Sequence, residues 1–303
     1  MNNIDFKVKF LLPEKHIFSR RPKAKRSFIS RLKDTGRHIK IFFQQFWGRA
    51  IGTKVKKRDQ LFVSNIYNNL YSLPTSEWAK TKIESKYLIE FKNDILEVNG
   101  WFLKSVYVQI LSGLLDQFNY SSILEVGSGR GDNLAALSLK NTNHKFTGLE
   151  RSSEGILAGR SLLKDLPNCR EIGDFDPWWA RFNLKDTRNS DTIDFVQGSA
   201  LEMPFGDKTF DVAFTVLVLE QIPYDYHKVL KEMSRVAKKY CIFLEPFREA
   251  NNLNGLVNLT RRDYFRFSYK NFSRFGLKPV YFSSDHPQKL KYRMGLLVTK
   301  VTK

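Results

Sequence analysis

The sequence predicts an α/β fold built around a mostly parallel sheet, and the stretch 123–137 carries most of this prediction. It runs from apolar, β-branched residues through three glycines into the apolar pattern of a helix, which is the order of a strand, a tight turn and a helix. The longest nearly uncharged run, 212–219, is too short to cross a bilayer and has the character of a buried parallel strand. A second such run, at 240–244, extends the predicted sheet.

The glycines at 127, 129 and 131 predict a turn that binds a ligand. Glycine adopts positive φ freely and lets backbone N–H groups approach a ligand, while the start of the following helix adds a partial positive charge. A dinucleotide-binding turn needs Gly or Ala at the position of Asp132, and a phosphate-cradling P-loop needs a Gly-Lys-Ser/Thr that is absent. The spacing therefore argues against both of these turns.

At this turn the chain resembles the class I S-adenosylmethionine-dependent methyltransferases, of the methyltransferase type 11-like kind, whose first motif is an acidic residue followed by x-G-x-G-x-G. Residues 125–131 match that motif in full, and 146–150 resembles the family's second strand, which ends in a carboxylate that holds the ribose. Residues 195–205 are similar to its third-strand turn, although Ser199 stands where an aspartate often binds the adenine amino group. Two later segments also resemble the family, the fourth strand with its turn at 210–223 and the V-L-x-E-x-x-R-V helix at 229–236.

The resemblance implies a Rossmann-like, seven-stranded, mostly parallel sheet with an antiparallel C-terminal hairpin strand, to which this chain adds a helical N-terminal extension. The implied cofactor is S-adenosyl-L-methionine, with S-adenosyl-L-homocysteine as product and no metal. Ligands of open parallel sheets bind beyond the carboxyl ends of the strands. The residues implied for cofactor binding are Glu125, Gly127, Ser128, Gly129, Gly131, Asn133, Glu150, Arg151, Ser199, Ala200, Leu201, Leu217 and Gln221.

A sulfonium methyl is already activated, so in-line displacement mainly requires that acceptor, methyl carbon and sulfur be held in line in a water-poor cleft. A general base helps when the acceptor is a hydroxyl, and Glu245 and Glu220 at strand ends are the candidates, each of which is also a candidate structural hydrogen-bond acceptor. The sequence shows no cleft cysteine, no N-P-P-Y tetrapeptide after the fourth strand and no acidic cluster for a metal. These absences favour a small-molecule, lipid or glycan acceptor over nucleic acid.

Charge is distributed unevenly along the 303 residues, whose formal net charge is +19. Seventeen of the 50 lysines and arginines fall in 7–58, so most of the excess lies in the first fifth of the chain. The two cysteines, Cys169 and Cys241, are far apart and predict neither a disulfide framework nor a zinc site, which favours a reducing compartment. No secretory signal or membrane span is visible, so we expect a cytoplasmic protein.

The N-terminal segment, 1–58, contains two patterns. Residues 15–26 are so polar and charged that they predict a flexible arm. Behind the arm, the aromatic and aliphatic residues of 39–47 recur at helical spacing with basic and amide residues between them, which predicts a basic amphipathic helix. Three roles of this helix remain open. It can dock on the core, it can lie on an anionic membrane surface that residues 20–58 contact, or it can help the arm bind nucleic acid. The aromatic residues lie on a single stripe, which favours membrane binding over nucleic-acid binding.

Residues 59–118 predict a helical cap over the substrate cleft, with helices over 60–71, 78–96 and 101–118. Four aromatic residues of this region are candidates for an acceptor pocket, although an aromatic residue on a helix is more often part of the core. These residues are Tyr67, Tyr71, Trp78 and Trp101.

The remaining domain, 119–303, contains an unusually long connection at about 167–192, where two to six residues are typical. Its aromatic content favours an ordered flap over the ligand, with a surface excursion as the alternative. The tail resembles the closing hairpin of the family, with helical 269–275 and strands at 278–283 and 294–301.

The sequence therefore predicts a methyltransferase that acts on a small-molecule, lipid or glycan acceptor, in the cytoplasm or at the cytoplasmic side of a membrane. Two alternatives remain open. One is an RNA or protein methyltransferase that uses the basic N-terminal segment, and the other is an inactive partner protein that only binds the cofactor.

Overall fold

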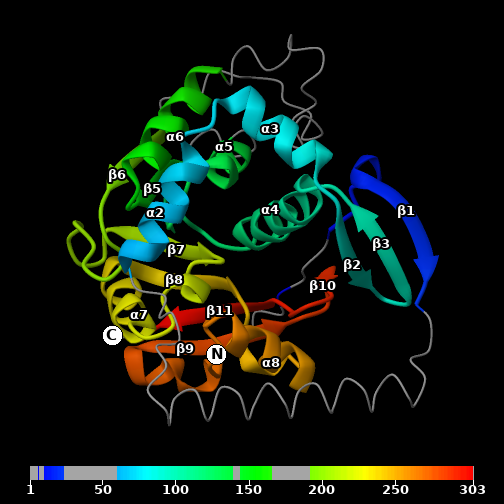
Figure 1. Ribbon diagram of the computed structural model, residues 1–303. Coiled ribbons are helices and arrows are strands. Elements are labelled where there is room, and N and C mark those ends of the chain that lie inside the picture. The colour runs from blue at the N-terminus through cyan, green and yellow to red at the C-terminus, as the bar shows by residue number, and fades with distance from the viewer. Residues whose placement is uncertain (1–5, 7–9, 24–59, 139–143, 166–191, 303) are drawn as a thin grey trace, which may run out of the picture.

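A seven-stranded sheet forms the centre of the molecule (Figure 1). The computed structural model describes Phe6 and residues 10–23, 60–138, 144–165 and 192–302. The strand order is β6-β5-β4-β7-β8-β11-β9, in which β4 to β8 pair in parallel and β11 runs antiparallel to both neighbours. The predicted fold class, a mostly parallel seven-stranded sheet with an antiparallel C-terminal strand, is confirmed. The strands are β4 Ser122–Val126, β5 Lys145–Glu150, β6 Ile193–Gln197, β7 Phe210–Val216, β8 Ala237–Glu245, β9 Leu277–Ser283 and β11 Gly295–Val301.

Helices cover both faces of this sheet because successive strand residues point to opposite sides. Ile123 packs with α4 and α5 on one face, whereas its neighbour Leu124 packs with α7 on the other. From β4 the chain proceeds to β5 and β6 in one direction and, after β7, to β8 in the other, so a crevice opens between the carboxyl ends of β4 and β7. The helices are α4 Trp101–Leu115, α5 Asp132–Ser138, α6 Ser153–Asp165, α7 Tyr226–Val236 and α8 Leu253–Arg261, with short 3-10 turns at Glu14–His16, Leu219–Gln221, Arg248–Ala250 and Tyr269–Phe275.

A second, four-stranded sheet of order β1-β3-β2-β10 lies beside the first and corrects two of the expectations. Residues 78–96 are not one helix, because the chain leaves the helix α3 at Glu84 (α3 is Thr75–Glu84) and forms the hairpin of β2 and β3. Lys92, in the turn of that hairpin, has a φ of 52°, as two-residue hairpin turns require. The strands are β1 Ile17–Pro22, β2 Tyr87–Phe91, β3 Asp94–Val98 and β10 Gln288–Lys289.

The strand β1 also shows that the expectation of a flexible arm over 15–26 is wrong for its first half. Its backbone pairs with β3 along its whole length, from Ile17 opposite Val98 to Pro22 opposite Asp94. Its side chains are mostly exposed, so the charges that suggested disorder stay in water while only the backbone pairs. Charge is therefore no obstacle to an edge strand.

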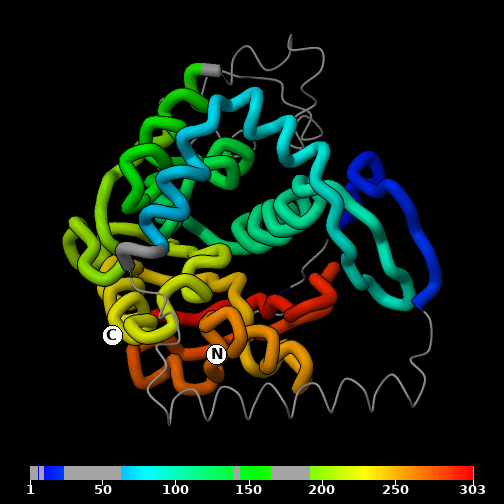
Figure 2. Tube along the Cα trace, viewed as in Figure 1, coloured from blue at the N-terminus to red at the C-terminus, as the bar shows by residue number. Residues whose placement is uncertain are grey.

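Two helices, α2 Gln60–Tyr71 and α3 Thr75–Glu84, pass over the carboxyl edge of the main sheet and contact α6 (Figure 2). They confirm the first predicted helix of the cap and the beginning of the second. The amphipathic helix over 39–47 and the flap over 167–192 fall on segments outside the described residues, apart from Thr192, and stay predictions. Among the helices that the structure describes, none has the length and apolarity needed to span a bilayer.

Candidate functional site

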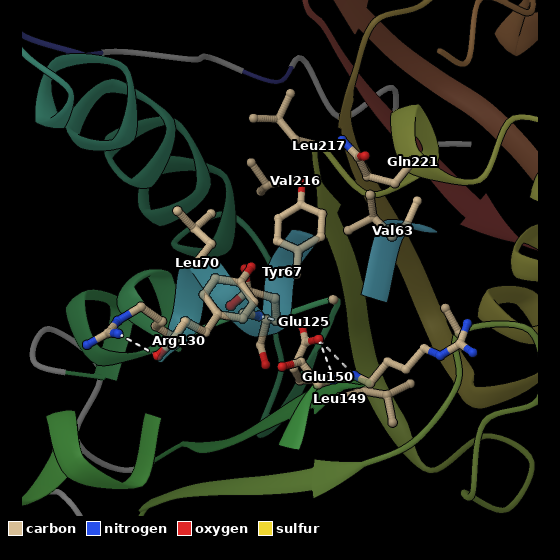
Figure 3. Close-up of a pocket in the computed structure, with 18 of the residues that line it drawn as sticks. Val63, Tyr67, Leu70, Glu125, Arg130, Leu149, Glu150, Val216, Leu217 and Gln221 are labelled. Atoms are coloured by element: carbon tan, nitrogen blue, oxygen red, sulfur yellow. Dashed lines mark hydrogen bonds between the residues drawn. The ribbon is translucent and has the colours of Figure 1, made fainter. Parts of the chain in front are cut away.

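A cavity of about 370 Å³ lies between the cap helices and the carboxyl ends of the parallel strands. Figure 3 shows Glu125 and Glu150 at one end, Val216 and Leu217 at the other, and Tyr67 between them. Nearly all residues implied for cofactor binding line this cavity. They are Glu125, Gly127, Ser128, Gly129, Asn133, Glu150, Arg151, Ser199, Ala200, Leu201, Leu217 and Gln221.

The glycine turn has the backbone geometry that the sequence predicts. Gly127, Gly129 and Gly131 have φ values of 70°, 56° and 74°, which lie in the left-handed region that favours glycine. A Cβ atom on Gly129 would lie 2.6 Å from the hydroxyl oxygen of Tyr71, which reaches down from α2. Gly131 does not line the cavity and faces the ring of Phe195, so its role is to pack the turn against the sheet.

Glu150, at the end of β5, is held by three backbone donors. Its Oε2 accepts a hydrogen bond from the N–H of Gly129 at 2.8 Å, and its Oε1 accepts from Arg151 and Ser152 at 2.9 and 2.8 Å. Burial raises the pKa of the carboxyl and the backbone bonds lower it. Because a carboxylate has about four lone-pair sites, Glu150 retains acceptor capacity toward the cavity for hydroxyl groups of a ligand.

Glu125, at the end of β4, leaves an acceptor without a partner. Its Oε1 accepts from the Asn133 side chain at 2.6 Å, whereas its Oε2 has no hydrogen-bond partner, although the residue is only 1% exposed. Burial raises its pKa to about 8. Ser128 Oγ and Asn133 Oδ1 are likewise buried without partners on the same wall. A buried polar atom without a partner is costly, so this end of the cavity fits a ligand that carries hydrogen-bond donors.

The turn after β6 contributes a less polar wall. Ser199 Oγ accepts a hydrogen bond from the N–H of Leu201 at 3.2 Å and thus stabilises the turn itself. The neighbouring Ala200 and Leu201 present apolar side chains to the cavity. A flat heterocycle can pack here with polar contacts mainly from the backbone.

The two candidate bases, Glu220 and Glu245, are not on the cavity wall. Glu245 is fully buried and accepts a hydrogen bond from the N–H of Val218 at 2.9 Å, and burial raises its pKa to about 8. Glu220 accepts from the side chain of Gln221 at 2.8 Å and from the hydroxyl of Tyr292 at 3.3 Å. Both carboxylates thus accept hydrogen bonds from the protein and lie off the cavity wall, and a role as general base stays a prediction for each.

The cap supplies wall residues that the sequence only partly identified. Tyr67, Tyr71 and Trp78 line the cavity as expected, but Trp101 belongs to the hydrophobic core. Arg130, inside the glycine turn, donates to the carbonyl oxygens at the end of α2 and so joins the turn to the cap. Its Nη1 lies 3.0 Å from Tyr71 O and 2.7 Å from Leu73 O, and its Nη2 lies 3.3 Å from Thr75 Oγ1.

Three other charged wall residues, Lys82, Lys104 and Asp132, were also missed. Lys104 Nζ and Asp132 Oδ2 form an ion pair at 2.7 Å. No local pattern in the sequence signals these residues, because they come together only through the packing of α3, α4 and α5.

The parallel sheet, the glycine turn and the acidic ends of β4 and β5 define an α/β protein that binds a nucleoside-type cofactor. Residues 124–244 match the family model described as a methyltransferase domain. This stretch is therefore a methyltransferase domain, and the resemblance to the class I S-adenosylmethionine-dependent methyltransferases is confirmed over these residues.

Curated relatives match over short stretches. The chain is 29% identical over 119 residues to a tRNA (guanine-N(7)-)-methyltransferase of Mycoplasma mycoides subsp. mycoides, covering 37% of this chain and 48% of that protein. It is 40% identical over 73 residues to a demethylmenaquinone methyltransferase of Staphylococcus carnosus, covering 24% of this chain and 30% of that protein. The chain thus matches about half the length of these relatives or less.

A solved structure supports the fold. The [4+2]-cyclase SpnF superposes with a TM-score of 0.52 at 14% identity, covering 78% of this chain and 94% of SpnF. At this level of identity the likeness shows the shared fold alone.

The residues of the cavity fit the family's cofactor, S-adenosylmethionine. The unpartnered Glu125 Oε2 suits the cofactor's ammonium group, Glu150 suits the ribose hydroxyls, and the turn at Ala200 and Leu201 suits the adenine ring. The fit rests on acceptor atoms of the protein that face donor groups of the cofactor, and the glycine turn leaves room for the cofactor to approach the backbone closely.

Proposed function

We propose that the protein transfers a methyl group from S-adenosylmethionine to a small apolar acceptor, either a soluble molecule or a lipid. The observation that carries this proposal is the division of one cavity into two unlike ends. The cofactor end contains the carboxylates Glu125 and Glu150, whereas the other end is formed by aliphatic side chains and by Tyr67. The aliphatic residues at this end are Val63, Val216 and Leu217.

When bound, the cofactor supplies a methyl group that is already activated by its sulfonium. The protein residues then have to orient the two ligands and exclude water. Glu125 and Glu150 hold the cofactor end, and Tyr67, on α2, separates this end from the apolar end. Leu217, with a φ of 60°, turns the chain sharply after β7 and forms the wall of the apolar end.

The apolar end has few groups that can move a proton. Glu220 and Glu245 lie outside it, and among the residues that the structure describes its polar side chains are the hydroxyls of Ser64 and Tyr67 and the amide of Gln221. None of these three is a strong base at neutral pH. This composition supports an acceptor whose methylated atom needs no carboxylate base in the protein.

The names of the matched relatives suggest two classes of acceptor. One matched protein is named a demethylmenaquinone methyltransferase, and a lipid-like acceptor of that kind would suit the apolar end. Another is named a tRNA methyltransferase, and the basic N-terminal residues keep an RNA acceptor as the second candidate. A protein that only binds the cofactor is the third candidate. We place the protein in the cytoplasm or at the cytoplasmic surface of a membrane, where an apolar acceptor would be reached.

Calorimetric titration with S-adenosylhomocysteine and with NAD tests the cofactor site. We expect micromolar binding of the first and none of the second. Glu150→Ala should weaken S-adenosylhomocysteine binding by about 1.5–3 kcal/mol, the range for hydrogen bonds to a charged group. Glu154→Ala is the matched control, because Glu154 is in the first turn of α6 nearby but is absent from the cavity wall. Binding of NAD in place of S-adenosylhomocysteine would refute the assignment.

Turnover tests the activity and the acceptor. The full chain is incubated with methyl-labelled S-adenosylmethionine and either a lipid extract or total RNA, and the label is followed into each fraction. Label in the lipid fraction supports the proposal. Label in RNA alone would transfer the assignment to the second candidate, and tight cofactor binding without any transfer would support the third.

A further inference from the structure

Lys82, in the last turn of α3, lies on the cavity wall with its ammonium group against an aromatic face. Its Nζ is 4.2 Å from the ring centroid of Trp78, which is itself buried. The stem of the lysine packs against Gly100, where an added Cβ would lie 2.9 Å from Lys82 Cδ. The side chain is therefore held in place and is not free to extend into water.

The charges near Lys82 leave it without a counter-ion. Asp132, the carboxylate whose charge acts on Lys82, pairs with Lys104 at 2.7 Å between Lys104 Nζ and Asp132 Oδ2. The Cζ atom of Arg130 also lies 5.3 Å from the ring centroid of Trp78, but its guanidinium donates to the carbonyl oxygens of Tyr71 and Leu73. Within the described part of the chain, no carboxylate lies at ion-pair distance from the Lys82 ammonium.

The electrostatic environment agrees with this geometry. Burial lowers the pKa of Lys82 to about 8, with Lys104 and Lys289 lowering it as well and Asp132 opposing them. Lys289, on β10, also has a pKa lowered by burial, which Glu220 opposes. Lys82 and Lys104 thus lie on one wall of the cavity, and a partly buried ammonium is costly unless an anion accompanies it.

We infer that the Lys82 ammonium binds the carboxylate or phosphate group of a ligand held in this cavity. Such an anion would accept charge-assisted hydrogen bonds from Lys82 while lying in the field of Lys104 and Lys289. The inference rests on the proposed function, because that function defines the two ligands that can supply the anion. One is the cofactor, through the carboxylate of its amino-acid end, and the other is the methyl acceptor. Both sources offer the same chemistry to the lysine, and they can be separated by experiment.

The decisive variant is Lys82→Met, which keeps the length and packing of the stem but removes the charge. Lys80→Met is the matched control, because Lys80 is on the same helix, is 74% exposed and faces Glu84 rather than the cavity. Removing a partly buried ammonium that has no ion-pair partner should not lower the melting temperature of the ligand-free protein. Circular dichroism therefore verifies that both variants are folded before binding is compared.

Three probes are titrated into the full-length protein and into each variant. They are S-adenosylhomocysteine, 5′-methylthioadenosine, which lacks the amino-acid carboxylate, and inorganic phosphate added to protein saturated with S-adenosylhomocysteine. If the anion belongs to the cofactor, Lys82→Met weakens S-adenosylhomocysteine about tenfold or more and leaves 5′-methylthioadenosine unchanged. If it belongs to the acceptor, Lys82→Met leaves both nucleosides unchanged and loses phosphate by a similar factor.

Equal binding of all three probes by Lys82→Met and Lys80→Met would overturn the inference. A wild-type protein that ignores both nucleosides would instead refute the cofactor assignment, and phosphate binding that still depends on Lys82 would then uphold the anion site alone. The two failures are thus distinguishable.

Discussion

Arg130 links the cofactor turn to the cap, and Arg130→Met tests how much that link stabilises the protein. Arg130 is 3% exposed, and its guanidinium donates to Tyr71 O at 3.0 Å, Leu73 O at 2.7 Å and Thr75 Oγ1 at 3.3 Å. Methionine fills much of the same volume but has no donor. The two backbone carbonyls would then lose a charged partner at the end of α2, where no later turn of the helix can replace it.

The magnitude follows from the contacts. A hydrogen bond to a charged group contributes about 1.5–3 kcal/mol, so the two short bonds to carbonyls set an upper value of about 6 kcal/mol. Removing a buried charge recovers part of its desolvation cost. We therefore expect a loss of about 3 kcal/mol in the free energy of unfolding, or a fall of about 6 °C in melting temperature at about 2 °C per kcal/mol for a chain of this size.

Thermal unfolding followed by circular dichroism measures this effect. Arg130→Lys should recover only part of the loss, because one ammonium cannot reproduce a planar fork that reaches two carbonyls and a hydroxyl. Arg160→Met is the matched control, since Arg160 makes a single long contact of 3.4 Å with the carbonyl of Phe195. A melting temperature for Arg130→Met equal to that of the control would refute the reasoning.

Gly129→Val should abolish S-adenosylhomocysteine binding in calorimetry, because the valine side chain would collide with Tyr71 and valine disfavours the positive φ of this position. The control variant Gly206→Val, at an open surface position, should bind S-adenosylhomocysteine normally. The pKa of Glu125, raised to about 8 from an ordinary 4.5, means that the folded state holds this proton more tightly than the unfolded state. Stability of the ligand-free protein should therefore fall as pH rises from about 4.5 to 8, and Glu125→Gln should flatten that slope in denaturant titrations, whereas an unchanged slope would contradict the burial argument. If the basic N-terminal residues bind an anionic surface, replacing 27–56 by a Gly-Ser linker should abolish sedimentation with anionic vesicles at low salt without changing cofactor binding. Failure of the unaltered protein to sediment would remove the membrane hypothesis.

The sequence identified the main sheet and the cofactor turn because both depend on local patterns. Buried parallel strands give apolar runs, and the three positive φ values at 127, 129 and 131 require glycine. The hairpin of β2 and β3 was mistaken for a helix because the apolar residues of 87–91 also fit helical spacing. Its partner β1 comes from much earlier in the chain, so no local window contained the evidence for the strand.

The site was predicted unevenly for the same reason. Glu125 and Glu150 were found because each ends a strand next to a recognisable turn. Lys82 and Arg130 were not found, since their importance depends on Trp78 and on the carbonyls of α2, which only the folded cap places beside them. Glu220 was selected for its position in the sequence, and the structure shows that its side chain is engaged by Gln221 and Tyr292 instead.

The strand β1 changes how the basic N-terminal segment is connected. The N–H of Lys23 donates to Asn93 O at 2.7 Å, and α2 begins at Gln60, so both ends of the segment 24–59 adjoin elements of the fold. Doubling or halving the number of residues between two fixed ends changes the closure free energy by only about 0.6 kcal/mol, so we expect the length of this connection to vary at little cost to folding. Cutting the chain at residue 58, by contrast, would remove β1 and expose the edge of β3. Insertions and excisions in this segment are thus tolerated far better than its removal from the N-terminus.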